Sequence, residues 1–148
     1  MVNELTVMNA LKEVIETQLN NYTPDSVDSM DKKNVILDFP DVDLMTKKSC
    51  IFIQPNYASY ENLSTNSDDS SFSINIFILC KRDKQENLVE KVFAYYNALY
   101  KLLRTNISLN GTVDFTDINS FDYYPQVSAT PGVVGMEVLI TCRYTKDY

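Results

Sequence analysis

The sequence predicts an α+β domain, in which a mainly antiparallel β-sheet carries two α-helices packed on one face and extends into a long β-hairpin arm. Three observations predict this fold. Segments 4–19 and 84–105 place apolar residues three and four positions apart, which is typical of amphipathic helices. Segments 72–81 and 136–144 alternate in the manner of strands. The very polar tract 64–71 separates strand-like segments and indicates the far end of a hairpin. We treat residues 1–148 as a single domain.

The first helix is expected from Glu4 to about Leu19. Asn3 is placed to cap its amino end, and Pro24 follows the polar residues that close it. A stripe of apolar side chains is expected to face the core, namely Leu5, Met8, Leu11, Ile15 and Leu19.

An acidic stretch begins in the second half of this helix and continues beyond it. Residues 13–43 hold eight carboxylates and two lysines, and Val35–Leu37 is expected to form a short edge strand inside that stretch. Asp41 and Asp43 have the spacing of a carboxylate pair that holds a hard cation. No glycine-bounded nucleotide fold surrounds the pair, so we interpret the segment as a solvated acidic loop.

Two antiparallel strands are expected at 50–54 and 72–81, joined by a long and mobile hairpin arm. One face of the second strand is apolar throughout. Its opposite face begins polar at Ser73 and turns apolar at Phe77 and Leu79, which predicts a strand whose far half is covered on both sides.

A second helix is expected from about Lys84 to Thr105, with Asp83 and Glu86 at the spacing of a capping box. It carries two adjacent apolar stripes: Leu88, Val92, Tyr95, Leu99 and Leu102 in the first, and Val89, Phe93, Tyr96, Tyr100 and Leu103 in the second. The simplest interpretation is that the first helix covers the second stripe. The competing interpretation is oligomerisation through Tyr95, Tyr96 and Tyr100, because tyrosine is enriched at interfaces.

The carboxyl-terminal third is expected to add two strands. Asn110-Gly111 marks a turn, 112–116 alternates as a strand, and 117–124 continues that strand with a bulge. Segment 131–135 reads as another turn, and 136–144 is the clearest strand of the chain.

Composition excludes several kinds of chemistry. The chain has no histidine, so it cannot form a serine hydrolase triad or a cysteine–histidine pair. Its three glycines cannot build a phosphate-cradling loop. Cys50, Cys80 and Cys142 each lie in an apolar run and are expected to be buried free thiols, which favours a reducing compartment. A net charge of −7 disfavours general nucleic-acid binding, and no apolar run is long enough for a membrane span.

An enzyme would therefore have to work with carboxylates alone, such as Asp114 with Asp117, or Asp38 with Asp41 and Asp43. Scattered surface acids explain these residues better. We expect no catalytic residue, no cofactor and no metal.

The order of these elements resembles the tail terminator or tail-to-head joining proteins of long-tailed bacteriophages and related prophages. The likeness comprises the opening helix through Leu5, Met8, Leu11 and Ile15, the hairpin ending in segment 72–82, the helix 88–103 and the closing strand 135–144. It covers nearly the whole chain and rests on architecture, since the family has no sharp catalytic or ligand motif.

The resemblance implies a structural virion protein, assembled in the bacterial host cytoplasm. It implies a ring, usually a hexamer, that caps the tail tube, meets the neck proteins of the head and lets DNA pass without binding it specifically. The hairpin arm and the exposed part of the second helix would then be subunit contacts, which singles out Tyr57, Tyr60, Asp68, Asp69, Tyr95, Tyr96 and Tyr100. The acidic loops would face the lumen or the head.

Two other functions fit the same sequence. A minor capsid or head-tail connector protein would share the phage context and the general architecture. An acidic inhibitor that mimics DNA would use its carboxylates as an ordered phosphate-like array, although the acids here gather in predicted loops.

Overall fold

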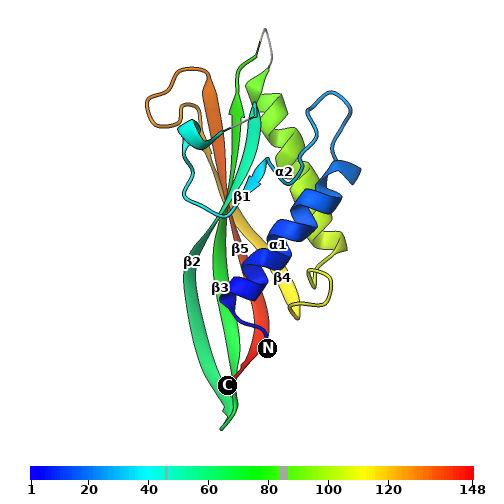
Figure 1. Ribbon diagram of the computed structural model, residues 1–148, viewed down its shortest axis with the longest axis vertical. Helices are drawn as coiled ribbons and strands as arrows, with labels where there is room; N and C mark the ends of the chain where they lie inside the picture. The colour runs from blue at the N-terminus through cyan, green and yellow to red at the C-terminus, as the bar shows by residue number, and fades with distance from the viewer. Residues whose placement is uncertain (46, 84–86) are drawn as a thin grey trace.

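The computed structural model describes residues 1–45, 47–83 and 87–148 (Figure 1). Along these residues the chain forms two α-helices, two short 3-10 helices and five strands: α1 (Glu4–Gln18), η1 (Leu19–Asn21), β1 (Val35–Ile36), η2 (Val42–Leu44), β2 (Ser49–Ser64), β3 (Ser67–Lys81), α2 (Leu88–Thr105), β4 (Phe115–Tyr124) and β5 (Val133–Asp147).

The strands form one mixed sheet in the order β1-β2-β3-β5-β4. The two-residue strand β1 runs parallel to β2, and every other neighbouring pair is antiparallel. Both helices lie on the same side of the sheet (Figure 1). The predicted α+β fold, including the short edge strand near Val35, is therefore confirmed.

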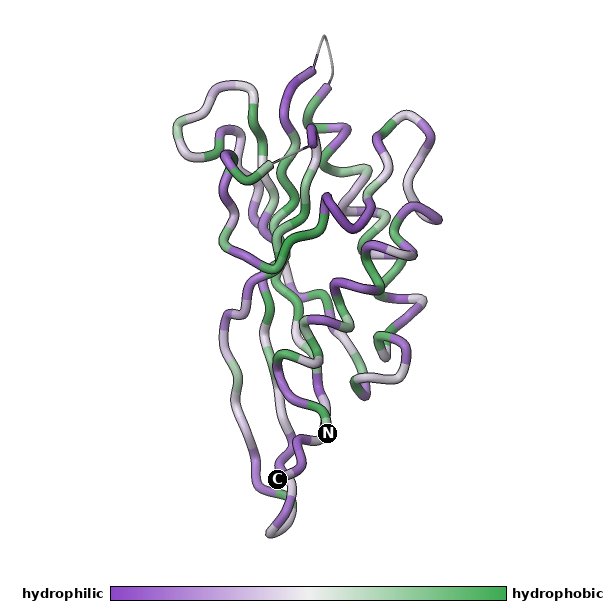
Figure 2. The backbone as a smooth tube through the Cα atoms, in the orientation of Figure 1, coloured by the Kyte–Doolittle hydropathy of each residue, from purple (hydrophilic) through white to green (hydrophobic). Residues whose placement is uncertain are grey.

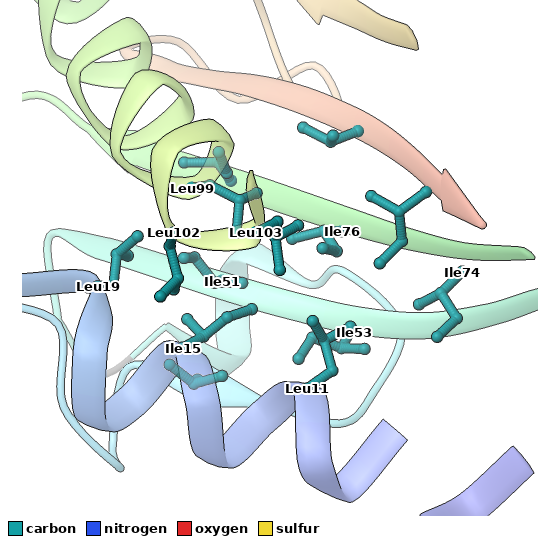
Figure 3. Packing of buried hydrophobic residues seen from close by; sticks show 14 of the residues in the cluster. Leu11, Ile15, Leu19, Ile51, Ile53, Ile74, Ile76, Leu99, Leu102 and Leu103 are labelled. Carbon is teal, nitrogen blue, oxygen red and sulfur yellow. The ribbon is translucent and has the colours of Figure 1, made fainter. Parts of the chain in front are cut away.

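The main core lies between the helices and the face of the sheet that they cover, which we call the inner face. Figure 3 shows Leu11 and Ile15 of α1 pointing toward Leu102 of α2 and toward Ile53 and Ile76 of the sheet. All five side chains are fully buried. Because the apolar spacing of each element matches its own period, the two helices and the sheet bury one continuous surface.

The opposite, outer face of the sheet is covered over only part of its length. Cys50, Phe52 and Leu79 form a second buried cluster there, against which Phe77 and Val127 pack. Ser73 and Thr141 lie farther along the same face and are only half-buried. The predicted switch along the outer face of β3 is thus confirmed: Ser73 in the polar half is only half-buried, whereas Leu79 in the apolar half is buried.

The amino end of α1 is capped as predicted, because the Asn3 side chain accepts a hydrogen bond from the backbone of Thr6 at 2.9 Å. Met8, Leu11, Ile15 and Leu19 are buried. Leu5 is the exception in the predicted stripe: it lies on the solvent side of α1 with Asn9 and Glu13, at spacings of four residues, and is exposed.

The hairpin arm is more regular than the sequence indicates. We define the arm as residues 56–64 of β2, 67–73 of β3 and 141–147 of β5. The polar tract that we expected to be an irregular connection is mostly strand, and only residues 65–66 turn. Figure 2 shows that this part of β2 and β3 is hydrophilic to neutral. The reason is β5, which pairs with β3 as far as Ser67↔Asp147 and supplies backbone hydrogen bonds whatever the side chains are.

Two boundaries differ from the sequence prediction. Helix α2 begins at Leu88 and its cap is Asn87, whose side chain accepts from the backbone of Glu90 at 3.2 Å. Asp83 therefore does not cap this helix, and the expected capping box is wrong in that respect. Lys84 and Glu86, which belong to the same prediction, lie outside the described residues. Strand β4 begins at Phe115, later than expected, and contains the predicted bulge between Ile118 and Ser120.

The residues around the two predicted turns behave differently. Asn110 and Gly111 have φ of +58° and +84°, so the turn before β4 is confirmed. Gly132 also has a positive φ, of +77°. Gly135 is not a turn residue: it is buried inside β5, where a Cβ atom would lie 2.9 Å from Leu79 and from Val127. Close packing on the outer face, rather than turn geometry, accounts for this glycine.

The three cysteines are buried, as predicted. Burial raises the pKa of the Cys142 thiol to about 11, which keeps it protonated at neutral pH. No helix in the described part of the chain is long and apolar enough to cross a membrane.

Candidate subunit interface

The second apolar stripe of α2 is left uncovered by α1 over most of its length, and only its last member, Leu103, is buried in the main core. Val89 and Tyr100 are 48% and 40% exposed, and Tyr96 is half-buried. What lies against the middle of this stripe is Phe121 of β4, packed on Phe93 and Tyr96. The expectation that the first helix would hide this stripe is therefore wrong for the part before Leu103, because α1 packs on the inner face of the sheet and on the side of α2 that carries Leu102 and Leu103 (Figure 3).

These rings form what we call the aromatic surface: Phe93, Tyr96, Tyr100, Phe121 and Tyr123. Phe93 meets Phe121 edge-on, with ring centroids 5.6 Å apart, and stacks on Tyr123 at 6.5 Å. Tyr96 lies 4.9 Å from Phe121 and 6.3 Å from Tyr100. Burial raises the pKa of Tyr96, with a further contribution from Tyr100, so its hydroxyl is neutral. Aromatic rings that are packed together but open on one side are typical of protein interfaces.

A cationic strip borders the aromatic surface. Lys101 and Arg104 are both exposed on α2 beside Tyr100. The Arg104 guanidinium lies over the Tyr100 ring, 5.4 Å from its centroid, and donates a 3.5 Å hydrogen bond to its hydroxyl. Tyr100 therefore holds Arg104 against the helix.

Tyr95 does not belong to this surface. It is fully buried on the other side of α2, where its hydroxyl donates a 2.7 Å hydrogen bond to the backbone carbonyl of Asp28. The buried Lys91 reaches the Asp28 carboxylate at 3.3 Å. Tyr95 thus fixes the loop after η1 on α2, and we remove it from the candidate interface.

Tyr95→Phe is expected to lower the free energy of unfolding by about 1 kcal/mol, because it deletes one buried hydrogen bond and leaves the packing intact. Chemical denaturation measures the change. Tyr100→Phe is the matched control and is expected to stay within about 0.5 kcal/mol of the original protein, since Tyr100 is exposed. An equal loss of unfolding free energy in both variants would contradict a stabilising role for the hydrogen bond from Tyr95 to Asp28.

The arm carries the other predicted interface residues. Tyr57 and Tyr60 are exposed, at 66% and 47%, and Leu63 near the turn is exposed as well. Asp68 and Asp69 are half-buried. Asp68 accepts hydrogen bonds from Asn62 at 3.2 Å and from the Tyr148 hydroxyl at 3.4 Å, which ties the end of β5 to the hairpin.

The inner face of the arm is fastened to the start of α1. Lys146 donates hydrogen bonds to both carboxylate oxygens of Glu4, at 3.0 and 2.9 Å, and its ammonium group lies 5.1 Å from the centroid of the Tyr60 ring. Partial burial acts to raise the pKa of Glu4, but hydrogen bonding and the charge of Lys146 outweigh it, so the pKa is lowered overall. The ion pair therefore stabilises the folded arm.

This ion pair predicts a pH dependence. A lowered carboxyl pKa stabilises the fold above the pKa of the unfolded chain, roughly 4.3 for glutamate, and the contribution disappears as the pH falls through the folded value. The difference in unfolding free energy between the original protein and Glu4→Gln is therefore expected to be constant near pH 7 and to shrink below about pH 4.3. Denaturation curves between pH 7 and pH 3 measure it. A difference that stays constant over this range would contradict the role of Glu4.

Two of the carboxylates that could have supported metal or acid–base chemistry, Asp38 and Asp41, have local roles. Asp41 accepts a hydrogen bond from the backbone of Asp43 at 2.9 Å and caps η2, and Asp38 accepts one from the backbone of Phe39. Among the described residues, no group of three or more His, Cys, Asp or Glu side chains is placed to hold a metal ion.

Sequence reasoning missed the contribution of β4 to the aromatic surface. Phe121 and Tyr123 lie in a tract that was expected only to continue a strand, and Phe93 was assigned to a covered stripe. The spacing of two between Phe121 and Tyr123 is the signal that could have found them, because it places both rings on one face of a strand.

A comparison with protein-family models finds no match, and a comparison with curated proteins finds none either. Among solved structures, the chain is similar to the sheath/tube terminator of PVC, an extracellular contractile injection system, in its extended state. The two are 10% identical with a TM-score of 0.42, and the match covers 95% of this chain and 57% of that one. This chain thus spans little more than half the length of that terminator chain. A likeness at this level concerns the course of the chain and does not by itself carry a function.

Proposed function

We propose that this protein is a structural subunit that assembles with copies of itself into a ring, caps the tube of a phage-type tail and joins that tail to the head. The observation that carries the proposal is the presence of two separate surfaces suited to protein contacts. One is the aromatic surface on α2 and β4, and the other is the projecting arm with Tyr57 and Leu63 exposed.

Two different surfaces on one subunit are what a closed ring requires. In a ring each subunit contacts the next head-to-tail, so a patch on one copy meets a different patch on its neighbour. Contacts of standard size cover about 800 Å² on each partner, and two of them would occupy about a fifth of the 7853 Å² accessible surface of this chain. The fold offers enough surface for both.

The proposal assigns no catalytic role and no cofactor to the chain, whose net charge of −7 is compatible with DNA passing through a ring without being held. Several carboxylates are paired with cations, including Glu16 with Lys12, Asp28 with Lys91 and Asp83 with Lys48. Such pairing disfavours a free phosphate-like array, and with it the DNA-mimic alternative.

Electron microscopy of tail tubes tests the capping role. The purified tube protein from the same gene cluster is polymerised with and without this chain. Extra density at one tube end and an arrest of growth at that end are expected with it. Unchanged growth with bare ends would contradict capping, and binding to head or neck components instead would assign the protein to the connector role.

A further inference from the structure

The outer face of the arm holds two carboxylates directly opposite each other. Glu61 of β2 and Asp69 of β3 are register partners, so their side chains lie on the same face of the sheet. Both line a hollow with Ser59, Ser71 and Arg143. Neither forms an ion pair in the described part of the chain, and the Arg143 guanidinium lies against Phe115, 5.6 Å from the ring centroid. Like charges placed directly across two strands oppose each other, and an added cation would relieve this.

The cationic strip on α2 is the complementary feature. Lys101 and Arg104 are three residues apart, so they project from neighbouring positions on the helix surface. Both are exposed beside Tyr100, and Lys101 forms no ion pair among the described residues. Asp117 of β4 acts on Arg104 electrostatically and leaves its side chain exposed. An aromatic ring flanked by two cations suits a partner that offers apolar side chains and two carboxylates.

The arm offers that combination. Tyr57 and Leu63 are exposed beside Glu61 and Asp69, so apolar and acidic groups alternate along one short stretch. The arm projects past both helices to one end of the longest axis of the molecule (Figure 1). It therefore extends away from α2 of its own chain, where a neighbouring copy can reach it.

We propose that the occupant of the cationic strip is the arm of a second copy of this chain. Glu61 and Asp69 of one subunit face Lys101 and Arg104 of the next, while Tyr57 and Leu63 pack beside Tyr100. The contact joins two different patches, so it propagates from subunit to subunit and closes where the rotation allows. This inference rests on the proposed ring and deepens it, because it states which surfaces meet.

Site-directed cross-linking tests the contact. One batch of the chain carries Asp69→Cys and a second carries Lys101→Cys, and the native cysteines stay protected because all three are buried. A mixture of the two batches treated with a short bismaleimide is expected to give a cross-linked pair containing one of each. Asp69→Cys mixed with Glu13→Cys, on the exposed side of α1, is the matched control and is expected to give at least tenfold less.

Charge reversal provides a second and independent measurement. Lys101→Glu with Arg104→Glu, or Glu61→Lys with Asp69→Lys, is expected to weaken self-assembly by about tenfold or more, because like charges then meet. A chain with all four reversals is expected to assemble again, since every contact carries the exchanged pair. Thermal unfolding of each variant shows whether the fold is intact.

The outcomes separate this contact from the function itself. Rings that form while the Asp69–Lys101 pair cross-links no better than the control would overturn the contact and leave the proposed ring standing. A cross-linked pair from a protein whose native mass never exceeds that of a dimer, with or without the tube protein, would support the contact and overturn the ring. A chain that stays monomeric with and without the tube protein and gives no cross-link would overturn both.

Discussion

Ile76→Asp is expected to leave the chain unfolded at room temperature. Ile76 is fully buried in β3, between Ile53 of β2 and Val138 of β5. An aspartate there would place a charge in the core with no partner, which costs several kcal/mol at least. A domain of this size is stable by only about 5–15 kcal/mol, so one such charge consumes most or all of that margin.

Circular dichroism with a thermal melt measures this effect. Ile140→Asp in β5 is expected to behave in the same way, because Ile140 is equally buried on the inner face and is paired with Ile74. Ile76→Val is the control and is expected to cost only about 0.5–1.5 kcal/mol. A cooperative melt of Ile76→Asp within a few degrees of the original protein would show that the inner face is not the core.

Asp68→Lys combined with Asp69→Lys is expected to leave the domain folded and to abolish or strongly weaken ring and tail assembly. Both residues are on the arm, where they are half-buried and do not belong to the main core. The double change reverses the charge of Asp69, which belongs to the proposed contact, and of its neighbour Asp68 on the other face of β3, so that the arm would be repelled by Lys101 and Arg104 of the neighbouring subunit.

Functional complementation measures this second effect, together with a melt that checks the fold. Glu13→Lys combined with Asp25→Lys makes the same change in net charge at exposed positions outside the arm and is expected to assemble normally. Normal assembly of the arm variant would remove the arm from the interface. Loss of assembly in both variants would point to net charge rather than to a specific contact.

Local periodicity was enough to predict the elements whose stability is local. The stripe through Leu11 and Ile15 predicts α1, and the Asn3 cap is confirmed because a cap depends only on residues three positions away. The alternation along 72–81 predicts β3 and even the change in cover on its outer face, because side chains alternate strictly between the two faces of a strand.

The arm could not be predicted in the same way. Residues 64–71 are polar and favour a loop by composition, yet Asp68 and Asp69 are in a strand because β5 pairs with them through Lys146 and Thr145. Backbone pairing with a segment nearly 80 residues away is invisible to any local pattern. Cross-strand hydrogen bonds override the weak propensity of these residues.

The candidate site shows the same division. The sequence placed Tyr95 and Tyr96 on two adjacent stripes of the correct helix. It could not show which stripe is buried, because that depends on segments that are distant in the sequence. The Tyr95 hydroxyl donates a hydrogen bond to the backbone carbonyl of Asp28, whereas the Tyr96 ring packs on Phe121. Gly135 was assigned to a turn for a comparable reason, because the side chains of Leu79 and Val127 that exclude a Cβ there come from other parts of the chain.

Native mass spectrometry shows whether the protein assembles with copies of itself. The purified protein is measured alone and then mixed with the tail tube protein from the same gene cluster. A closed ring of identical subunits in either condition is the predicted result. A protein that is monomeric alone and remains a monomer in the presence of the tube protein would show that it is not a ring-forming subunit.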